Sequence, residues 1–255
     1  MKKLISFVIK HIPRKYLQHF AHFGAKFLGL FYRGHGVHCN VCDHEYREFL
    51  PYGRTPPRAN ALCPNCLTLE RHRLMWRYLE DKTDFFTAPK KVLHIAPELC
   101  FIKRFEKMRN LEYITGDLES PLAKVKMDVH QIPFEDHHFD AVFCNHVMEH
   151  VEDDHQAMSE IFRVLKKGGF AILQSPQDMS LEHTFEDPSI TSPQAREDAY
   201  GQTDHVRLFG RDYGQRLKKA GFDVLEDTFV QRLPEEEVRK YGFPAEEIVY
   251  FCRKN

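Results

Sequence analysis

The stretch Phe139–Pro176, FDAVFCNHVMEHVEDDHQAMSEIFRVLKKGGFAILQSP, decides the fold of this chain. It opens with a short apolar run at residues 141–144, bounded by polar residues as buried parallel strands are. A helix is predicted next, because residues 152–154 supply capping acids and apolar side chains then recur at helical spacing. Gly168 is predicted to stop this helix after two lysines, before a second apolar strand at residues 170–173. Strand, helix and strand make one right-handed βαβ unit.

The same alternation of strands and helices continues on both sides of this unit. Helices are predicted at residues 101–108, 154–167 and 211–220. Strands are predicted at seven places: Val92–Ile95, Tyr113–Thr115, Val125–Met127, Ala141–Cys144, Phe170–Leu173, Val224–Phe229 and Ile248–Cys252. The pattern predicts an α/β fold with a Rossmann-like, doubly wound, seven-stranded sheet, in which ligands bind beyond the carboxyl ends of the strands.

Composition and charge divide the chain into a basic front and an acidic body. The whole chain is 42% hydrophobic and 29% charged, which is typical of a globular protein. Residues 1–91 hold 16 Lys and Arg against 7 Asp and Glu, a balance of +9, and the remaining 20 against 30 give −10. Such a front suits an anionic partner or surface. We expect a basic amphipathic helical arm at 1–36, a small zinc-binding module at 37–85, and a catalytic domain at 91–255 with an insertion at about 177–210.

Four of the seven cysteines form two CxxC pairs: Cys39, Cys42, Cys63 and Cys66. Two such turns, twenty residues apart, can present four thiolates to one tetrahedral zinc ion. Because all four ligands are protein thiolates, no position is left for water, and the zinc is expected to be structural. This use of cysteine favours a metal site in a reducing, cytoplasmic compartment over disulfide bonds.

A helix is predicted over residues 67–82, directly after the second cysteine pair. Its apolar residues are expected to face inward, and its basic residues form a cationic face: Arg71, His72, Arg73 and Arg77. Two interpretations stay open for this face. It is either simply solvated, or it contacts an anionic substrate.

Residues 1–33 hold seven Lys and Arg and no acid, with Pro13 dividing two apolar runs. Neither run approaches the roughly 20 residues of a membrane-spanning helix, and no cleavage site of a secretory signal follows. Three interpretations remain: helices packed on the catalytic domain, an interfacial helix on the anionic inner face of a membrane, or an arm that contacts nucleic acid.

The segment IPFEDHHFDAVFCNHVMEHVEDD, followed by EIFRVLKKGGFAIL, resembles class I S-adenosylmethionine-dependent methyltransferases. These share an "LPF…FD.V…HV.EH" strand and loop and an "R.LKPGG" helix end. The likeness covers residues 91–253. The front, CPNC followed by ERHRL, resembles that of bacterial methyltransferases with an N-terminal cysteine knuckle.

The resemblance implies a set of cofactor contacts at four strand ends. In the family the first end is glycine-rich, whereas this chain replaces the acid and the glycines by His94, Ala96, Pro97 and Glu98. Either the cofactor binds in an altered pose, which we favour, or the domain is degenerate. At the second end Asp117 is expected to accept the ribose hydroxyls, with Leu118 beside the adenine. At the third, Asp128 and Val129 are expected to meet the adenine amino group.

At the fourth strand end, Asn145 is expected to lie against the cofactor and His146 to point toward the methyl group. Methyl transfer is an in-line displacement, so an enzyme must align the reacting atoms and, for a protonated nucleophile, provide a base. His146 is the predicted base, Glu149 the other candidate, and His150 is expected to be structural. In the insertion, His205 and Arg207 are candidate acceptor contacts.

These patterns together predict a methyltransferase that uses S-adenosylmethionine and structural Zn²⁺. The expected acceptor is a small or membrane-associated molecule, glycan- or lipid-linked, methylated at O or N. Two alternatives stay open: an adaptor that has lost catalysis, and an RNA methyltransferase. The acidic body and the absence of an NPPY-like loop speak against nucleic acid as a partner.

Overall fold

The computed structural model describes residues 24–53 and 56–255. Most of the expected basic arm, residues 1–23, lies outside this description, and residues 24–31 are helical. The chain divides into two compact units: one contains residues up to Phe86 together with Thr228–Glu247, and the other contains Thr87–Asp227 and Ile248–Asn255. The division expected from sequence kept residues 228–247 with the sheet, whereas the structure groups them with the cysteine-bearing front.

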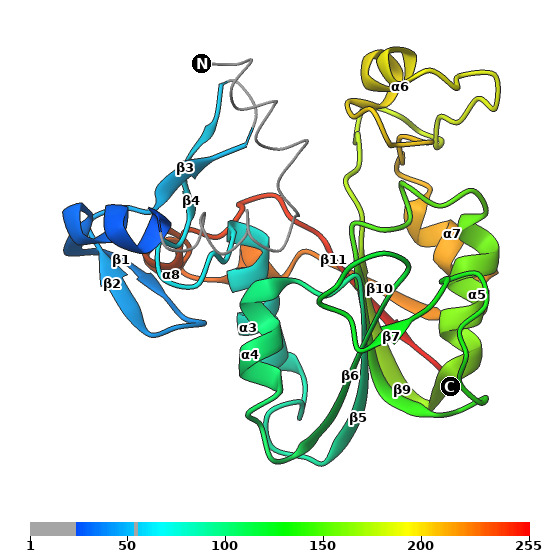
Figure 1. The fold of residues 1–255 in the computed structure, drawn as a ribbon, viewed down its shortest axis with the longest axis horizontal. Helices are drawn as coiled ribbons and strands as arrows, with labels where there is room; N and C mark the ends of the chain where they lie inside the picture. Colours follow the sequence, from blue (N-terminus) through cyan, green and yellow to red (C-terminus); the bar gives the residue numbers. More distant parts are fainter. Residues whose placement is uncertain (1–23, 54–55) are drawn as a thin grey trace. The chain divides into compact units, whose positions relative to one another are not determined.

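The second unit is built on one seven-stranded mixed sheet, which confirms the predicted fold (Figure 1). In spatial order the strands are β10 (Asp223–Asp227), β11 (Val249–Arg253), β9 (Leu165–Gln174), β8 (Phe139–Asn145), β5 (Lys90–Ile95), β6 (Leu111–Asp117) and β7 (Val125–Lys126). The strands from β9 to β7 run parallel, and β11 is antiparallel to both of its neighbours.

At the centre of the sheet the order of the strands along the chain changes direction: β6 and β7 are added on one side of β5, and β8 and β9 on the other. Strand β5 pairs with β6 on one side and with β8 on the other, so Leu93 is opposite both Ile114 and Val142. Such a switch point opens a crevice at the carboxyl ends of the two central strands. Residues 94–98 and 145–150 lie at or directly after these ends, where the candidate site is expected.

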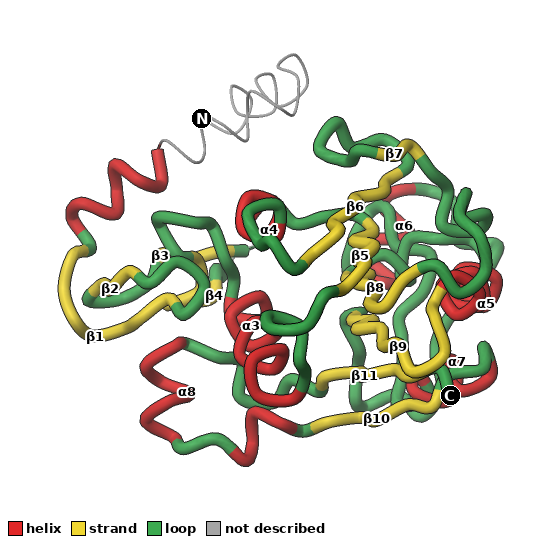
Figure 2. Tube along the Cα trace, turned by 90° about the horizontal axis from the view of Figure 1, so that it is seen from below, coloured by secondary structure: helices red, strands yellow, loops and turns green. Residues whose placement is uncertain are grey.

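Helices cover both faces of the sheet. Figure 2 shows α4 (Leu99–Phe105) on one face and α5 (Asp154–Val164) with α7 (Tyr213–Lys219) on the other. The guanidinium of Arg216 donates to both carboxylate oxygens of Asp154 at 2.7 Å, which fixes α7 beside α5. As predicted, an acid caps α5, since Asp153 accepts a hydrogen bond from the backbone N–H of Gln156 at 2.9 Å. A further short helix, α6 (Pro193–Tyr200), lies in the insertion.

The carboxyl end of α5 differs from the prediction. The helix ends at Val164 instead of continuing to residue 167, and β9 begins at once with Leu165. Lys166 does not face the helix dipole, because its amino group binds both oxygens of Asp140 on β8, at 2.8 and 2.9 Å. Gly168 does have a positive φ of 76°, but it lies within the first residues of β9 and not at the end of the helix. Pairing with β8 therefore overrides the local stop signal.

The first unit contains two small hairpins and a helix. The hairpins are β1 (Arg33–Cys39) with β2 (His44–Tyr46) and β3 (Leu50–Tyr52) with β4 (Arg58–Leu62), and the helix is α3 (Glu70–Lys82). Residues 228–247 add a 3₁₀ turn, Phe229–Arg232, and α8 (Glu235–Tyr241).

The basic residues of α3 do not form the expected cationic face. Arg73 is 0% exposed and His72 is also buried, while Arg77 pairs with Glu237 at 2.7 Å. Arg73 donates hydrogen bonds to four backbone carbonyls, those of Ala61, Thr68, Tyr241 and Gly242. A buried guanidinium is tolerated when its donors are satisfied in this way. Through these bonds Arg73 fastens the end of α8 to the cysteine-bearing front.

Candidate functional site

The four cysteines of the two CxxC pairs converge in the first unit. Their sulfur atoms all lie within 4.8 Å of one another, with Cys39 Sγ 3.6 Å from Cys66 Sγ and Cys42 Sγ 3.6 Å from Cys63 Sγ. A tetrahedral zinc ion with bonds of about 2.3 Å needs sulfur separations of about 3.8 Å. The donor set and the spacing therefore fit Zn²⁺.

Both CxxC turns have the same backbone geometry. In each, the residue after the second cysteine has a positive φ, Asp43 at 55° and Leu67 at 62°, and donates its N–H to the carbonyl of the first cysteine. Thr68 adds a hydroxyl 3.2 Å from the sulfurs of both Cys39 and Cys66, a contact that the sequence analysis missed. Two matched turns that hold four thiols inward are typical of a structural metal site.

In the second unit, the loop after β5 is organised by a buried histidine. His94 is 0% exposed; its Nδ1 lies 2.7 Å from the Tyr113 hydroxyl, and its Nε2 binds the carboxylate of Glu98. Burial and the nearby Glu98 raise the pKa of Tyr113, so its hydroxyl keeps its proton. The other oxygen of Glu98 accepts a hydrogen bond from the side chain of Asn145 at 3.0 Å.

This arrangement joins the carboxyl ends of β5 and β8. Ala96 adopts the left-handed φ of 49° that glycine usually supplies, and its N–H donates to the carbonyl of Gly116 at 2.9 Å. Pro97 follows as a buried residue. The Glu98 carboxylate therefore occupies the space near the switch point, on a loop that lacks the glycines of the family.

At the end of β6, Asp117 holds the following turn. One carboxylate oxygen, Oδ1, accepts hydrogen bonds from the N–H groups of Glu119 and Ser120, at 2.8 and 2.6 Å. Leu118 is 53% exposed beside it. The turn thus uses one oxygen of Asp117 and leaves the other available to a ligand, as far as the described residues record.

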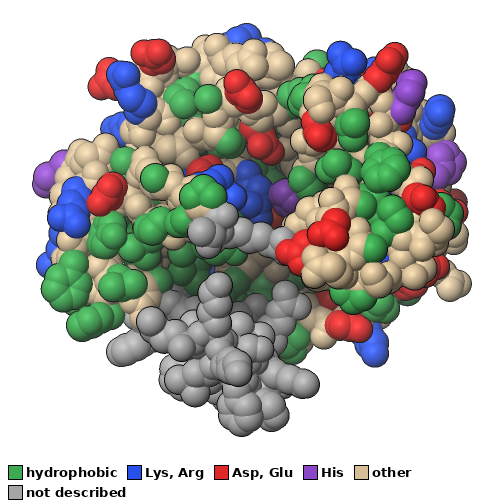
Figure 3. All heavy atoms as spheres, turned by 90° about the horizontal axis from the view of Figure 1, so that it is seen from above, with side chains coloured by type: hydrophobic (Ala, Val, Ile, Leu, Met, Phe, Trp, Pro, Cys, Tyr) green, Lys and Arg blue, Asp and Glu red, His purple; other side chains and the backbone are tan. Residues whose placement is uncertain are grey.

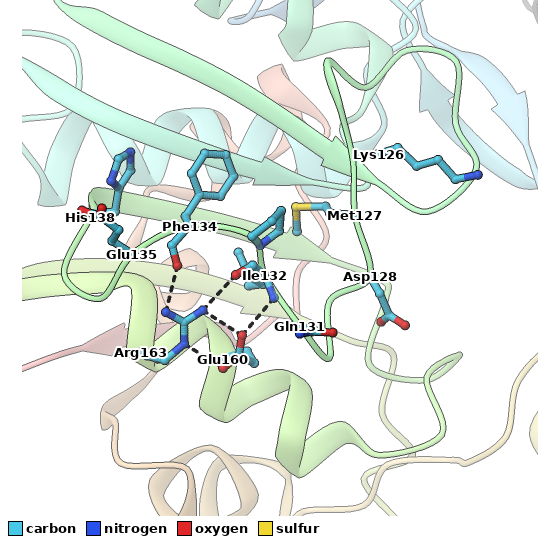
Figure 4. Close-up of a pocket in the computed structure, with 11 residues that line it drawn as sticks. Lys126, Met127, Asp128, Gln131, Ile132, Phe134, Glu135, His138, Glu160 and Arg163 are labelled. Atoms are coloured by element: carbon cyan, nitrogen blue, oxygen red, sulfur yellow. Dashed lines mark hydrogen bonds and ion pairs between the residues drawn. The ribbon is translucent and has the colours of Figure 1, made fainter.

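Asp128 lies at one end of an open pocket of about 970 Å³, shown in Figure 4. A hydrogen bond from the N–H of His130 lowers the pKa of Asp128. In the figure the pocket runs from Asp128 to Glu135 and His138 at the opposite end, and Arg163 of α5 donates to the carbonyls of the intervening loop. Val129 is buried next to Asp128. Of the expected cofactor contacts, Asp128 alone is among the lining residues of this pocket.

Directly after β8, His146 stands in a left-handed conformation with φ of 56°. Its backbone N–H donates to Gln174 at 2.7 Å, and its Nδ1 lies 3.3 Å from Glu149 Oε1. Burial raises the pKa of Glu149, but hydrogen bonds from His146 and from Ser175 outweigh it, so the pKa is lowered and the carboxylate is ionised. The structure therefore pairs the two candidate bases, His146 and Glu149.

The insertion contributes residues that pack against this loop. Arg207, a candidate acceptor contact, is 3% exposed and donates to the carbonyls of Met148, Val151 and Glu152. Its donors are thus used to hold the loop after β8. His205, by contrast, brings its ring to within 4.7 Å of the ring of His150, measured between centroids.

Comparisons with known proteins agree with the geometry of the second unit. A family model described as "Methyltransferase domain" matches residues 90–173. A tRNA U34 carboxymethyltransferase from Nautilia profundicola is 30% identical over 135 residues, which are 52% of this chain and 41% of that protein. An uncharacterised 37.1 kDa transposon protein of Streptomyces fradiae is 31% identical over 108 residues, 41% of this chain and 30% of that protein. The chain thus spans less than half the length of these curated relatives.

Among solved structures, the fold is similar to that of a SAM-dependent methyltransferase from Archaeoglobus fulgidus, with a TM-score of 0.46 and 18% identity over 71% of this chain and 93% of that one. The segment that matches the family model, residues 90–173, includes β5, β8 and all of β9 but its last residue. Residues 90–173 of this chain are therefore similar to a methyltransferase domain.

Proposed function

We propose that this protein transfers a methyl group from S-adenosylmethionine to O or N of a small or membrane-associated acceptor, glycan- or lipid-linked. The observation that carries the proposal is the bond between Asn145 and Glu98, 3.0 Å long, which joins the ends of the two central strands where ligands of such sheets bind. The Glu98 carboxylate is half-buried and both of its oxygens are hydrogen-bonded, which supports a functional loop over a degenerate one.

The cofactor would be held by the three strand ends. Glu98, held by His94 and Asn145, provides a negative charge for the ammonium of the amino-acid end, while Ala96 and Pro97 shape the loop. Asp117 accepts the ribose hydroxyls through the carboxylate oxygen that its turn does not use, and the exposed Leu118 packs on the adenine. Asp128 and the Val129 backbone meet the adenine edge.

When bound, the cofactor supplies a methyl group on a positively charged sulfur. The residues after β8 orient and deprotonate the acceptor. His146 takes the proton at its Nε2, since its Nδ1 faces the ionised Glu149, which stabilises the protonated ring. Ser175 in turn holds Glu149 through a hydrogen bond of 2.8 Å. This arrangement suits an acceptor hydroxyl or amine that must lose a proton.

Zinc in the first unit would be structural, bound by Cys39, Cys42, Cys63 and Cys66. Three of the four cysteines are buried and the fourth, Cys66, is half-buried. The cluster also lies near the buried Arg73, whose charge offsets the two negative charges of a zinc ion with four thiolates.

The helical residues 24–31 support a membrane-associated acceptor. Phe27, Leu28, Leu30 and Phe31 are 56%, 48%, 52% and 64% exposed. In Figure 3, apolar side chains gather at the left of the face in view. Among the described residues, no helix is both long enough and apolar enough to cross a membrane. Exposed aromatic residues beside a basic segment suit an interfacial helix on anionic lipid.

The membrane arm is tested with the double substitution Phe27→Ser and Phe31→Ser. The full chain should co-sediment with phosphatidylglycerol-containing vesicles at low salt, and the double variant should not. Leu225→Ser removes an equally exposed apolar side chain, 54% exposed, from the second unit and is the matched control. If the wild-type chain ignores these vesicles, residues 24–31 serve packing instead.

Methyl transfer itself is tested in two steps. Calorimetry should show binding of S-adenosylmethionine to the full chain, and Glu98→Gln, which keeps the shape but not the charge, should weaken it. The chain should then release S-adenosylhomocysteine when a lipid-linked or glycan fraction is added. A folded chain that does not bind the cofactor at all would support the adaptor function.

RNA is the second candidate acceptor, because the name of the Nautilia profundicola relative assigns a tRNA substrate to that protein. The same product assay with total tRNA distinguishes the two acceptors. Product formation with tRNA and none with the lipid or glycan fraction would replace the first proposal by the second.

A further inference from the structure

A second cluster of metal-ligating side chains belongs to the second unit, whereas the four cysteines belong to the first. Glu149, His150 and His205 each offer a ligand atom, and these three atoms lie within 4.8 Å of one another. Glu149 and His205 are 1% and 3% exposed, whereas His150 is more accessible, with a side chain 34% exposed. The cluster thus has two buried members and one that faces solvent.

His205 has a buried nitrogen that lacks a partner. Its Nε2 makes no hydrogen bond in the structure, although the residue is almost wholly buried. The ring does have one hydrogen bond, with the backbone of Tyr200, and this bond must be made by the other nitrogen, Nδ1. Buried polar atoms without a partner are rare and often mark a bound ion or water.

His150 is oriented in the same manner. Its Nδ1 lies 3.2 Å from the carbonyl oxygen of Asp204, so Nδ1 carries the proton and Nε2 keeps its lone pair. Metal-binding histidines usually donate their second ring N–H to a carbonyl or carboxylate, which fixes the tautomer and the direction of the ring. Both histidines of the cluster therefore have the outer hydrogen bond that a metal ligand needs.

The backbone around the cluster is held rigidly. The N–H of Val206 donates to the carbonyl of Glu149 at 2.9 Å, which joins the segment of His205 directly to the loop of Glu149 and His150. Arg207 adds hydrogen bonds to three carbonyls of the same loop. The three side chains are thus placed by two segments that are fastened together, which favours a preformed site.

We propose that Glu149, His150 and His205 bind a divalent first-row transition-metal ion such as Zn²⁺. Two imidazoles and one carboxylate are a common ligand set for open metal sites, in which water or substrate completes the coordination. The site differs from the cysteine cluster in its nitrogen and oxygen donors and in its open positions.

The site has a role if the proposed function holds, since it follows β8 beside His146. The metal would bind a hydroxyl oxygen of the acceptor and orient that oxygen for methyl transfer. The acceptor would then be a molecule methylated at oxygen. This role rests on the proposed function, whereas metal binding does not.

Metal binding is tested by titrating the full chain, purified with its cysteine site filled, with Co²⁺ alone. One equivalent should bind with a visible spectrum that lacks the strong charge-transfer absorption of thiolate-bound cobalt. His150→Ala is the main variant, because this side chain is partly exposed and its loss should leave the fold intact. Even the loss of an outer partner weakens metal binding roughly 10–100-fold, so His150→Ala should cost at least about tenfold.

Two controls separate this site from others. His155→Ala removes an exposed histidine of α5 and should leave the titration unchanged. His205→Gln should weaken binding as His150→Ala does. If Co²⁺ does not bind beyond the cysteine site, or binds as tightly to His150→Ala as to the wild type, the proposal is wrong and water fills the place beside His205. The titration uses no cofactor, so its failure is distinct from a failure to bind S-adenosylmethionine.

Discussion

Replacing Arg73 by Met should unfold the first unit locally while the seven-stranded sheet stays intact. Arg73 is wholly buried and donates to the carbonyls of Ala61, Thr68, Tyr241 and Gly242. Its guanidinium also lies 3.9 Å from the ring centre of Phe49. Methionine fills part of this volume but offers no donor, so four buried or half-buried carbonyls lose the guanidinium as a partner.

The magnitude follows from these bonds. The Thr68 carbonyl still accepts the N–H of Cys63, so three carbonyls are left without this donor, and at about 1 kcal/mol each they give about 3 kcal/mol. This agrees with the roughly 3–5 kcal/mol lost when one partner of a buried charged interaction is removed. Arg73→Lys keeps the charge but has fewer donors in a different geometry, and it should fall between wild type and Arg73→Met.

Hydrogen exchange measured by mass spectrometry is the assay, because it reports each segment separately. In Arg73→Met the amides of α3 and α8 should lose protection, those of β5 and β8 should not, and a chelator should remove the zinc faster. Arg77→Met is the matched control: Arg77 is 26% exposed and its pair with Glu237 should contribute at most about 1 kcal/mol. Unchanged protection of α8 in Arg73→Met would refute the reasoning.

Three further predictions concern the cofactor, the acid stability and the zinc. Asp117→Ala should weaken S-adenosylmethionine binding by roughly 1.5–3 kcal/mol in calorimetry. Glu119→Ala, the control, should leave this affinity unchanged. If Asp117→Ala binds the cofactor normally but melts at a lower temperature, Asp117 only stabilises its own turn. The pKa of Asp140 lies below its ordinary value of 3.8, because hydrogen bonds from Lys166 and the Lys91 N–H outweigh burial. The stability that Asp140 contributes is therefore present above pH 3.8 and is lost as the pH falls through the lower folded-state pKa. The melting temperatures of wild type and Asp140→Asn should thus converge as the pH is lowered. A difference in melting temperature that stays constant with pH would contradict this. A mercurial should release zinc from the wild-type chain, and Cys63→Ser should contain less zinc than wild type before this treatment. Cofactor binding should be unchanged in this variant. A full equivalent of zinc in Cys63→Ser would contradict the four-cysteine site.

Local patterns sufficed for the sheet and for the cysteine cluster. Every one of the seven predicted strands is present. The central parallel strands β5, β8 and β9 show in the sequence because a strand buried on both faces needs a continuous apolar run. Each CxxC turn orients its own two thiols through local backbone geometry, so the fold has only to bring the two turns close together. The cap of α5 at Asp153 is equally local.

Tertiary structure decided the features that depend on distant partners. Sequence alone favours a solvated Arg73, since burying a charge is costly, and only carbonyls as far away as residues 241 and 242 make its burial possible. The length of α5 was set by pairing of Lys166 with β8 and not by Gly168. Glu149 and His150 meet His205 across more than fifty residues, because the insertion folds back on the loop after β8. Local spacing carries no signal for such a meeting, so the cluster of Glu149, His150 and His205 could be found only in the folded chain.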